Sequence, residues 1–317
     1  MTRRFLLLLI LPALPLAAQT NPQCAGYAID RARNICDAAI DGAHIFTPVA
    51  GILMSGGNAV LGSSDGLGGA PHFVVTLRAN ATKVVVPDVN YSGIGRTVAA
   101  GQEVTAPAPI VEGALGLFRG TSRGHLAVDL LGSVQLLPTT LIDAVRVSSD
   151  ARRIGSIALG LGIGGRLTLL GEGSVRPGIA VSLMRRSIPR IDVGDVAAGD
   201  RFSFGTDLTV TNYRATIGKQ FALLMLAAGV GWDEYTGRAS VTFRDPVTNL
   251  VQPPIAIGLI DKRGVAFANA GLVLGPVVLV AELGYQRGKA LGLGTTFTNN
   301  DPTVQRLFGG AGFRFGF

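Results

Sequence analysis

The sequence contains few charged residues for its length, and this shortage narrows the class of protein. Only 15% of its 317 residues are Asp, Glu, Lys or Arg, against about 25% in an average globular protein. The hydrophobic share is 48%, and glycine is abundant at 44 residues. Disordered chains combine low hydrophobicity with high charge, so disorder is excluded. A cytosolic enzyme is also a poor match, which leaves a secreted β-rich protein or a membrane protein.

Long hydrophobic runs are missing from most of the chain. One of the two longest lies at the N-terminus, where Arg3 and Arg4 precede the apolar run 5–11 and the small residues Ala17 and Ala18. A charged start, a short apolar core and a small-residue cleavage site predict a secretory signal peptide over residues 1–19. After it no segment reaches eighteen apolar residues, which excludes transmembrane helices as the main spanning elements.

Cysteine is nearly absent, since only Cys24 and Cys36 occur. Export would allow them to form a disulfide, and together with the distant His44 they do not supply the four ligands of a zinc site. Residues 25–43 also carry a helical stripe of small apolar residues. Twelve residues of straight helix span about 18 Å, whereas disulfide-bonded Cα atoms lie within about 7 Å. We favour the disulfide, with a helix that is broken or starts late.

From residue 70 onward the sequence alternates with a period of two. At the C-terminus Phe313, Phe315 and Phe317 alternate with glycines and Arg314, which is the pattern of a strand with one apolar face. Ten such strands are predicted, at 72–81, 109–119, 125–137, 153–170, 173–186, 203–218, 219–232, 263–274, 277–287 and 303–317. A hairpin from 49–54 and 59–61, with a glycine-rich turn at 55–58, would raise the count to twelve.

The connections between these strands alternate in length. Short ones, at 120–124, 171–173, 218–219 and 275–276, fall on the side where Phe317 ends, and the long ones fall on the other. Outer-membrane barrels have short periplasmic turns and longer outer loops. We therefore predict an all-β fold, a transmembrane antiparallel up-and-down β-barrel of 10–12 strands, with twelve favoured and a short N-terminal helix. The predicted division is a signal peptide (1–19), a helical segment that forms a luminal plug (20–45) and the barrel (46–317).

These features resemble a known class of protein. Export signal, alternating strands and the final residues Gly312-Phe313-Arg314-Phe315-Gly316-Phe317 look like those of Gram-negative outer-membrane β-barrel proteins, with a porin-like character. In that class the terminal aromatic strand is recognised by the assembly machinery. The resemblance therefore implies this role for Phe313, Phe315 and Phe317, with outer-membrane lipid and the barrel-assembly machinery as partners. One Trp and five Tyr are few for the two aromatic girdles of such a barrel.

Charged side chains on the faces opposite the apolar ones are predicted to point inward. A lipid-facing Arg at mid-depth costs roughly 2–4 kcal/mol, so the lumen is the expected location for Arg78, Glu112, Asp129, Arg166, Arg176, Glu282 and Arg314. One interpretation is a charged constriction that selects solutes. The other is a filled interior in which the same charges pair.

A stretch at 221–227 is apolar on both faces, which would place Phe221, Leu223 and Met225 in the lumen. They would line a path for hydrophobic solutes or pack against the N-terminal helix. Catalysis is not expected, because His125 and Ser133, which share a strand face, are about 26 Å apart by the strand rise. The formal charge of +7 is dispersed, so we expect no nucleic-acid partner.

The sequence thus predicts a non-enzymatic outer-membrane barrel without cofactor or metal. The primary hypothesis is a porin-like channel for passive passage of small solutes. The alternatives are an uptake barrel for hydrophobic compounds with an N-terminal hatch, and a closed structural or surface-interaction barrel.

Overall fold

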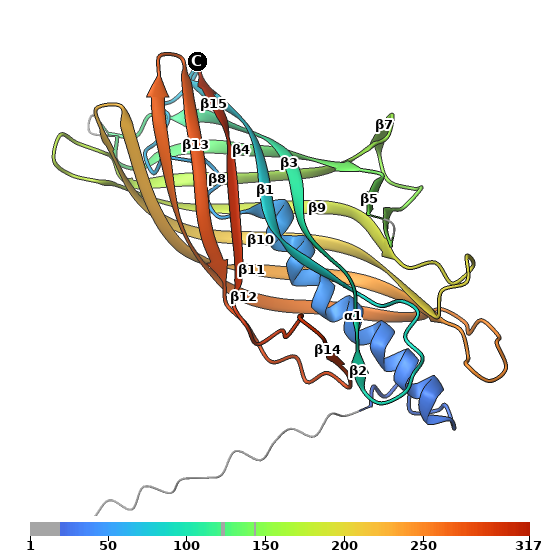
Figure 1. Ribbon diagram of the computed structural model, residues 1–317. Coiled ribbons are helices and arrows are strands. Elements are labelled where there is room, and N and C mark those ends of the chain that lie inside the picture. Colours follow the sequence, from blue (N-terminus) through green and yellow to red (C-terminus); the bar gives the residue numbers. More distant parts are fainter. Residues whose placement is uncertain (1–19, 122–123, 143) are drawn as a thin grey trace, which may run out of the picture.

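Ten antiparallel strands close into a barrel in the computed structural model, which describes residues 20–121, 124–142 and 144–317 (Figure 1). The predicted signal peptide, residues 1–19, lies outside the described residues. The barrel strands are β1 (Phe73–Pro87), β3 (Ala100–Phe118), β4 (Ala127–Pro138), β8 (Ile157–Leu170), β9 (Gly178–Val193), β10 (Phe202–Phe221), β11 (Leu224–Phe243), β12 (Ile255–Leu274), β13 (Val277–Gln286) and β15 (Arg306–Gly316).

Each barrel strand pairs with its neighbours in the chain, and one further pairing closes the circle. The first strand, β1, pairs with the last, β15. The topology is therefore up-and-down. Short strands lie outside this circle on the loops: β2 (Thr97–Val98), β5 (Thr140–Ile142), β6 (Val145–Val147), β7 (Arg153–Ile154) and β14 (Thr296–Phe297). Closure leaves no continuous sheet edge, as a hydrocarbon environment requires.

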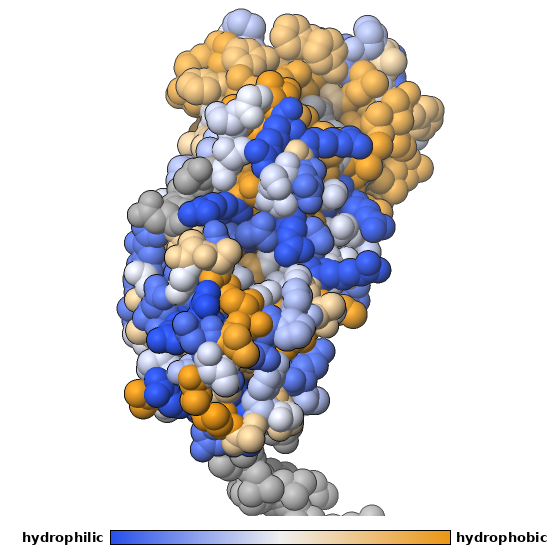
Figure 2. All heavy atoms as spheres, turned by 90° about the vertical axis from the view of Figure 1, so that its right-hand side faces the viewer, coloured by the Kyte–Doolittle hydropathy of each residue, from blue (hydrophilic) through white to orange (hydrophobic). Residues whose placement is uncertain are grey.

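The two faces of each strand differ in polarity. On β11, Leu226, Val230 and Trp232 are exposed on the outside, whereas Met225 and Asp233 are buried inside. Beyond Trp232 the outward positions become polar, as at Arg238. Figure 2 shows apolar side chains gathered in a band at the short-turn end, with polar ones over most of the remaining surface. The strands thus cross an apolar belt and continue beyond it toward the long loops.

Aromatic side chains mark both edges of this belt. Tyr213 stacks on Trp232 with ring centroids 4.9 Å apart, toward the long loops, and Phe73 stacks on Phe317 at 4.8 Å, at the short-turn end. One stacked aromatic pair therefore lies at each edge of the belt.

One helix, α1 (Asp30–Ser55), runs inside the barrel (Figure 1). It is long and apolar enough to cross a membrane, but 94% of its most apolar window is buried within the protein. It replaces the predicted hairpin, so the barrel has ten strands and not the favoured twelve. The hairpin prediction was wrong because residues 49–54 are apolar on every side, and a helix that is surrounded on all sides shows the same pattern.

The domain boundaries shift for the same reason. The helix continues to Ser55 and the first barrel strand begins only at Phe73, whereas the sequence placed this boundary at residue 45. Cys24 and Cys36 form a disulfide with their Cα atoms 5.7 Å apart. This geometry is reached because the helix begins late, at Asp30, and Cys24 lies in the turn before it.

Candidate functional site: a charged lumen occupied by the N-terminal segment

Most of the charged residues selected from the sequence line the lumen. Their side chains are buried on the inner faces of six strands: Arg78, Glu112, Asp129, Arg166, Glu282 and Arg314. Arg176 does not join them. It lies in the turn before β9, where its Nε donates to the carbonyl oxygen of Gly171 at 3.2 Å. The prediction for Arg176 was wrong because β9 begins only at Gly178, so the alternation that placed it inward does not reach it.

A continuous network of ion pairs and hydrogen bonds crosses the lumen. Glu112 on β3 accepts from Arg78 on β1 at 3.0 Å and from Arg186 on β9 at 2.8 Å. Arg186 also donates to Asn212 on β10. Asn212 in turn donates to Asp233 on β11 at 2.6 Å. Side chains from five strands thus meet in one network.

The network extends along the barrel wall from Asp233. Its Oδ1 lies 2.6 Å from a guanidinium nitrogen of Arg214, and its Oδ2 accepts from the hydroxyl of Tyr235 at 2.9 Å. That hydroxyl accepts from Gln286 at 2.6 Å. All of these side chains are buried. Burying charges is costly unless partners satisfy them, and here each charge has partners.

Two side chains of β1 hold the C-terminal end of α1. The last carbonyl groups of a helix have no partner within it, and cations there are stabilised by the helix dipole. The last turn of the helix contains no basic residue, so the donors to its carbonyl groups come from the barrel wall. Arg78 donates to the carbonyl oxygen of Ser55 at 2.8 Å, and Asn80 to that of Leu53 at 3.1 Å.

Side chains of the wall form hydrogen bonds with both the C=O and the N–H groups of the residues after the helix. Arg214 donates to the carbonyl oxygens of Gly56 at 3.1 Å and Gly57 at 2.8 Å. Glu282 accepts from the backbone N–H of Gly57 at 2.8 Å and of Asn58 at 2.7 Å. An arginine and a carboxylate on opposite parts of the wall therefore clamp one peptide stretch.

The clamped stretch continues toward the short-turn end of the barrel. Arg314 donates to the carbonyl oxygen of Leu61 at 2.7 Å. Asp129, paired with Arg166 at 2.7 Å, accepts from the backbone N–H of Leu67 at 3.2 Å. We call residues 30–69 the luminal segment, and side chains of the wall bind its backbone from Leu53 to Leu67.

A glycine allows the helix to lie against the wall. A Cβ added to Gly51 would lie 2.1 Å from Cε1 of Tyr235, whose ring is held by the hydrogen bonds to Asp233 and Gln286. Such a distance is far inside van der Waals contact, so a larger residue requires the helix or the ring to move.

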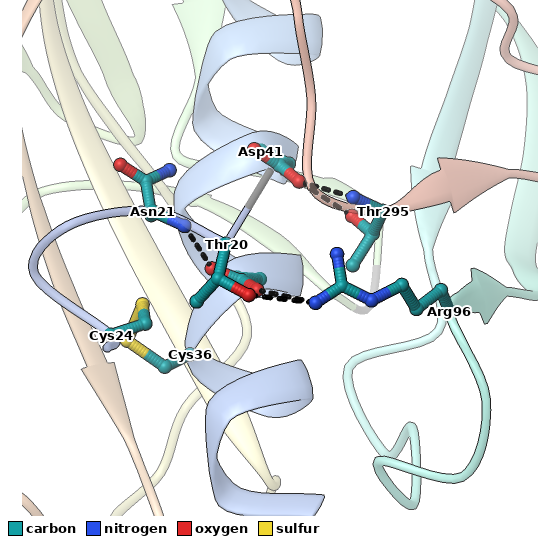
Figure 3. Close-up of a disulfide and its surroundings, with 8 residues drawn as sticks. Thr20, Asn21, Cys24, Cys36, Asp41, Arg96 and Thr295 are labelled. Atoms are coloured by element: carbon teal, nitrogen blue, oxygen red, sulfur yellow. Dashed lines mark hydrogen bonds and ion pairs between the residues drawn. A yellow bond between two sulfur atoms is a disulfide. The ribbon is translucent and has the colours of Figure 1, made fainter. Parts of the chain in front are cut away.

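The N-terminal half of α1 is anchored at the long-loop end of the barrel, and Figure 3 shows the contacts that hold it. Asp41 accepts from the backbone N–H and the hydroxyl of Thr295, in the loop between β13 and β15, at 2.7 and 2.8 Å. Burial raises the pKa of Asp41 to about 7, while the two bonds from Thr295 act in the opposite direction. Nearby, Asn21 donates its backbone N–H to Asp37, and Arg96 reaches Thr20.

Sequence reasoning missed several members of the network, among them Arg186, Asn212, Arg214 and Asp233. A signal existed for Arg186, because it closes the predicted strand 173–186 and shares a face with Arg176, which the alternation had placed inward.

The predicted apolar lumen patch is present only in part. Met225 is buried, but Phe221 and Leu223 are more than half exposed at the turn between β10 and β11. The stretch looked apolar on both faces because a two-residue turn at 222–223 interrupts it. The strands on either side therefore contribute their outward residues, Phe221 and Leu224, next to each other.

The remaining predicted residues are located as follows. Phe313 and Phe317 are exposed on the outer face or end of β15, and Phe315 is half-buried there. His125 accepts from the backbone N–H of Gly171 at 3.0 Å, in the short-turn region. Among residues 20–121, 124–142 and 144–317, no three His, Cys, Asp or Glu side chains gather as a metal site.

Comparisons with known proteins give structural similarities only. No family model and no curated protein matches the sequence. The translocator domain of the autotransporter NalP from Neisseria meningitidis is similar over 87% of this chain and 98% of that one, with 11% identity and a TM-score of 0.45. The TodX deltaS2S3 mutant monoaromatic hydrocarbon channel matches 84% of this chain and 70% of its own, with 12% identity and a TM-score of 0.32.

An anion-selective porin from Comamonas acidovorans matches 78% of this chain and 98% of its own, with 10% identity and a TM-score of 0.16. By its own topology and its outer apolar belt, the chain is a closed barrel of the outer-membrane type, and its own N-terminal segment occupies the lumen.

Proposed function

We propose that this protein is an outer-membrane channel that its luminal segment closes at rest, and that small hydrophilic solutes pass when the segment leaves its position. The observation that carries the proposal is the clamp on residues 56–58 by Arg214 and Glu282. These wall charges bind backbone groups of a removable segment, so they become available to solutes once it moves.

The chemistry of the freed lumen indicates the solutes. Its walls would present buried arginines and carboxylates in nearly equal number: Arg78, Arg166, Arg186, Arg214, Arg263 and Arg314 against Glu112, Asp129, Asp233, Asp261 and Glu282. A pore with charges of both signs favours small polar or charged solutes over apolar ones. The slight excess of arginine favours anions.

The same proposal includes the route to the membrane. Residues 1–19 would act as a signal peptide that directs export. The outer membrane would be the site of function, and Phe313, Phe315 and Phe317 would be recognised by the barrel-assembly machinery. An outward apolar belt with aromatic edges supports a lipid partner.

A second candidate is a permanently closed structural or surface-interaction barrel. It is favoured by the packing of the first half of α1, where Ile35 and Ile40 belong to one apolar core cluster with Phe202, Phe204 and Phe243 of the long strands. Displacing this half exposes apolar surface, which is costly.

Single-channel conductance in a planar bilayer separates the two candidates. The protein from residue 20 onward is compared with a variant that lacks residues 20–69, and so loses the luminal segment and both cysteines, after circular dichroism has shown that both are folded barrels. We expect rare or no openings in the first and steady ohmic steps in the second. Silence in both folded proteins would reject the channel and support the closed structural barrel.

A further inference from the structure

The barrel wall splits toward the long-loop end between β3 and β4. Their ladder runs from Phe118 opposite Val128 to Ile110 opposite Gln135 and stops there. Residues 100–109 of β3 pair only with β1, while the end of β4 stays with β8. In Figure 1, β3 turns down toward β2 whereas β8 and β9 run on to the right.

Prolines stand where the ladder stops. Continued past Ile110, the register would set Pro109 opposite Leu136 and Pro107 opposite Pro138. Proline has no N–H to donate, and within sheets it is confined to edges. The ladder of β3 with β1 remains continuous across both prolines, so the missing donors fall on the free edge. The split is therefore encoded in the sequence.

An apolar cavity of about 150 Å³ lies behind the split. Helix α1 contributes Phe46, Val49 and Leu53, and the wall contributes Val104 of β3, Val145 of β6 and Ile191 of β9. All twelve residues around the cavity are apolar. Nothing in this lining can hydrogen-bond water through a side chain.

The cavity reaches the exterior at the edge of the apolar belt. Two of its lining residues, Pro107 and Pro138, are exposed. Toward the long loops, Glu103 and Lys83 form an ion pair on the outer face, with 2.7 Å between the carboxylate and the ammonium. Toward the short turns the outward residues are apolar, as at Leu136 and Leu159. A ligand that enters sideways therefore crosses from the hydrocarbon boundary without passing through the charged lumen.

We propose that this cavity is a binding site for an uncharged hydrocarbon group the size of benzene, reached laterally through the split between β3 and β4. An apolar cavity of this size in a protein interior stays free of water and accepts benzene. The lining offers no charged or polar side chain for a headgroup or a hydrophilic solute. The site is independent of the proposed channel, because it does not require the luminal segment to move.

Fluorine NMR titration with fluorobenzene tests this proposal on the protein held in an amphipol. Two variants fill the cavity from opposite sides, Ala50→Phe from the helix and Ala106→Phe from β3, since both residues line it. Ala228→Phe is the matched control, because Ala228 lies on the lipid-facing side of β11. We expect saturable binding by the wild type and Ala228→Phe, and none by either filled variant that folds.

The titration is repeated in lipid nanodiscs to identify the source of the hydrocarbon. Saturable binding in both settings supports a free small hydrocarbon as the ligand. Saturable binding in amphipol alone supports the same site with a lipid acyl chain as occupant. Unsaturable partition that is equal in all four proteins would overturn the proposal, whatever the conductance experiments show.

Discussion

At the scale of single residues, Arg214 links the barrel wall to the luminal segment. Its guanidinium pairs with Asp233 and donates to the carbonyl oxygens of Gly56 and Gly57. Removing one partner of a buried ion pair leaves the other charge uncompensated, which is far more costly than replacing both.

Arg214→Met is therefore expected to lower the free energy of unfolding by about 3–5 kcal/mol, because it leaves Asp233 buried beside fewer donors. Arg238→Met, on the exposed outer face of β11, is the matched control and is expected to change it by less than about 0.5 kcal/mol. Urea unfolding followed by circular dichroism measures both. Equal losses in the two variants would show that Arg214 has no special role in holding the structure.

The predictability of individual residues depended on strand boundaries. Arg78, Glu112 and Arg314 could be placed inward because they lie well inside strands, where alternation is unambiguous. Arg176 and Leu223 were misplaced because each lies in a turn, where the alternation resets. The ion-pair and hydrogen-bond partners of these side chains could not be predicted, because the sequence of one strand does not determine its register with its neighbour.

At the scale of elements, the structure of α1 could be predicted only at its start. The apolar stripe of 25–43 indicated a helix, but its second half lies in the lumen with barrel wall on every side, so the stripe widens until no face is polar. It also contains Pro48, a residue type that usually interrupts helices. The side chains that hold the helix end, Arg78 and Asn80, come from β1, the next element along the chain, and the helix's own residues do not indicate them.

The attachment of α1 to the loop between β13 and β15 is expected to depend on pH. The pKa of Asp41 is raised from 3.8 to about 7 by burial, so the folded protein holds this proton more tightly than the unfolded chain. Its contribution to stability is full below pH 3.8 and is lost as the pH rises to about 7. Above that pH Asp41 is ionised in both the folded and the unfolded state, so its effect on stability no longer changes with pH.

Unfolding temperature measured from pH 4 to pH 8 checks this. The wild type is expected to lose stability with rising pH more steeply than Asp41→Asn, which cannot ionise at this position. Asp37, whose pKa is also raised mainly by burial, adds a slope of the same sign to both proteins. Identical slopes would exclude Asp41 as the group responsible.

At the scale of the whole molecule, the ten-strand barrel follows from alternation and turn length, and each of the ten strands predicted after residue 70 corresponds to one barrel strand. The strand ends were less predictable. Strands β10, β11 and β12 continue far beyond the apolar belt, where their outward residues are polar, as at Asp207. Alternation between an apolar and a polar face fades there. The long-loop ends of β11 and β12, residues 233–243 and 255–262, were therefore predicted as loop, whereas that of β10 lies within the predicted strand 203–218.

The central claim is that the luminal segment closes the barrel, and a single methyl group at Gly51 tests it most directly. Single-channel conductance is recorded for Gly51→Ala, whose added Cβ would meet Tyr235 at 2.1 Å, and for Gly26→Ala, where nothing lies within 4 Å. Overpacking costs about 1–3 kcal/mol, which corresponds to a rise in open probability of roughly 5- to 150-fold. We predict frequent openings for Gly51→Ala and wild-type behaviour for Gly26→Ala. Silence of a correctly folded Gly51→Ala protein would contradict the account.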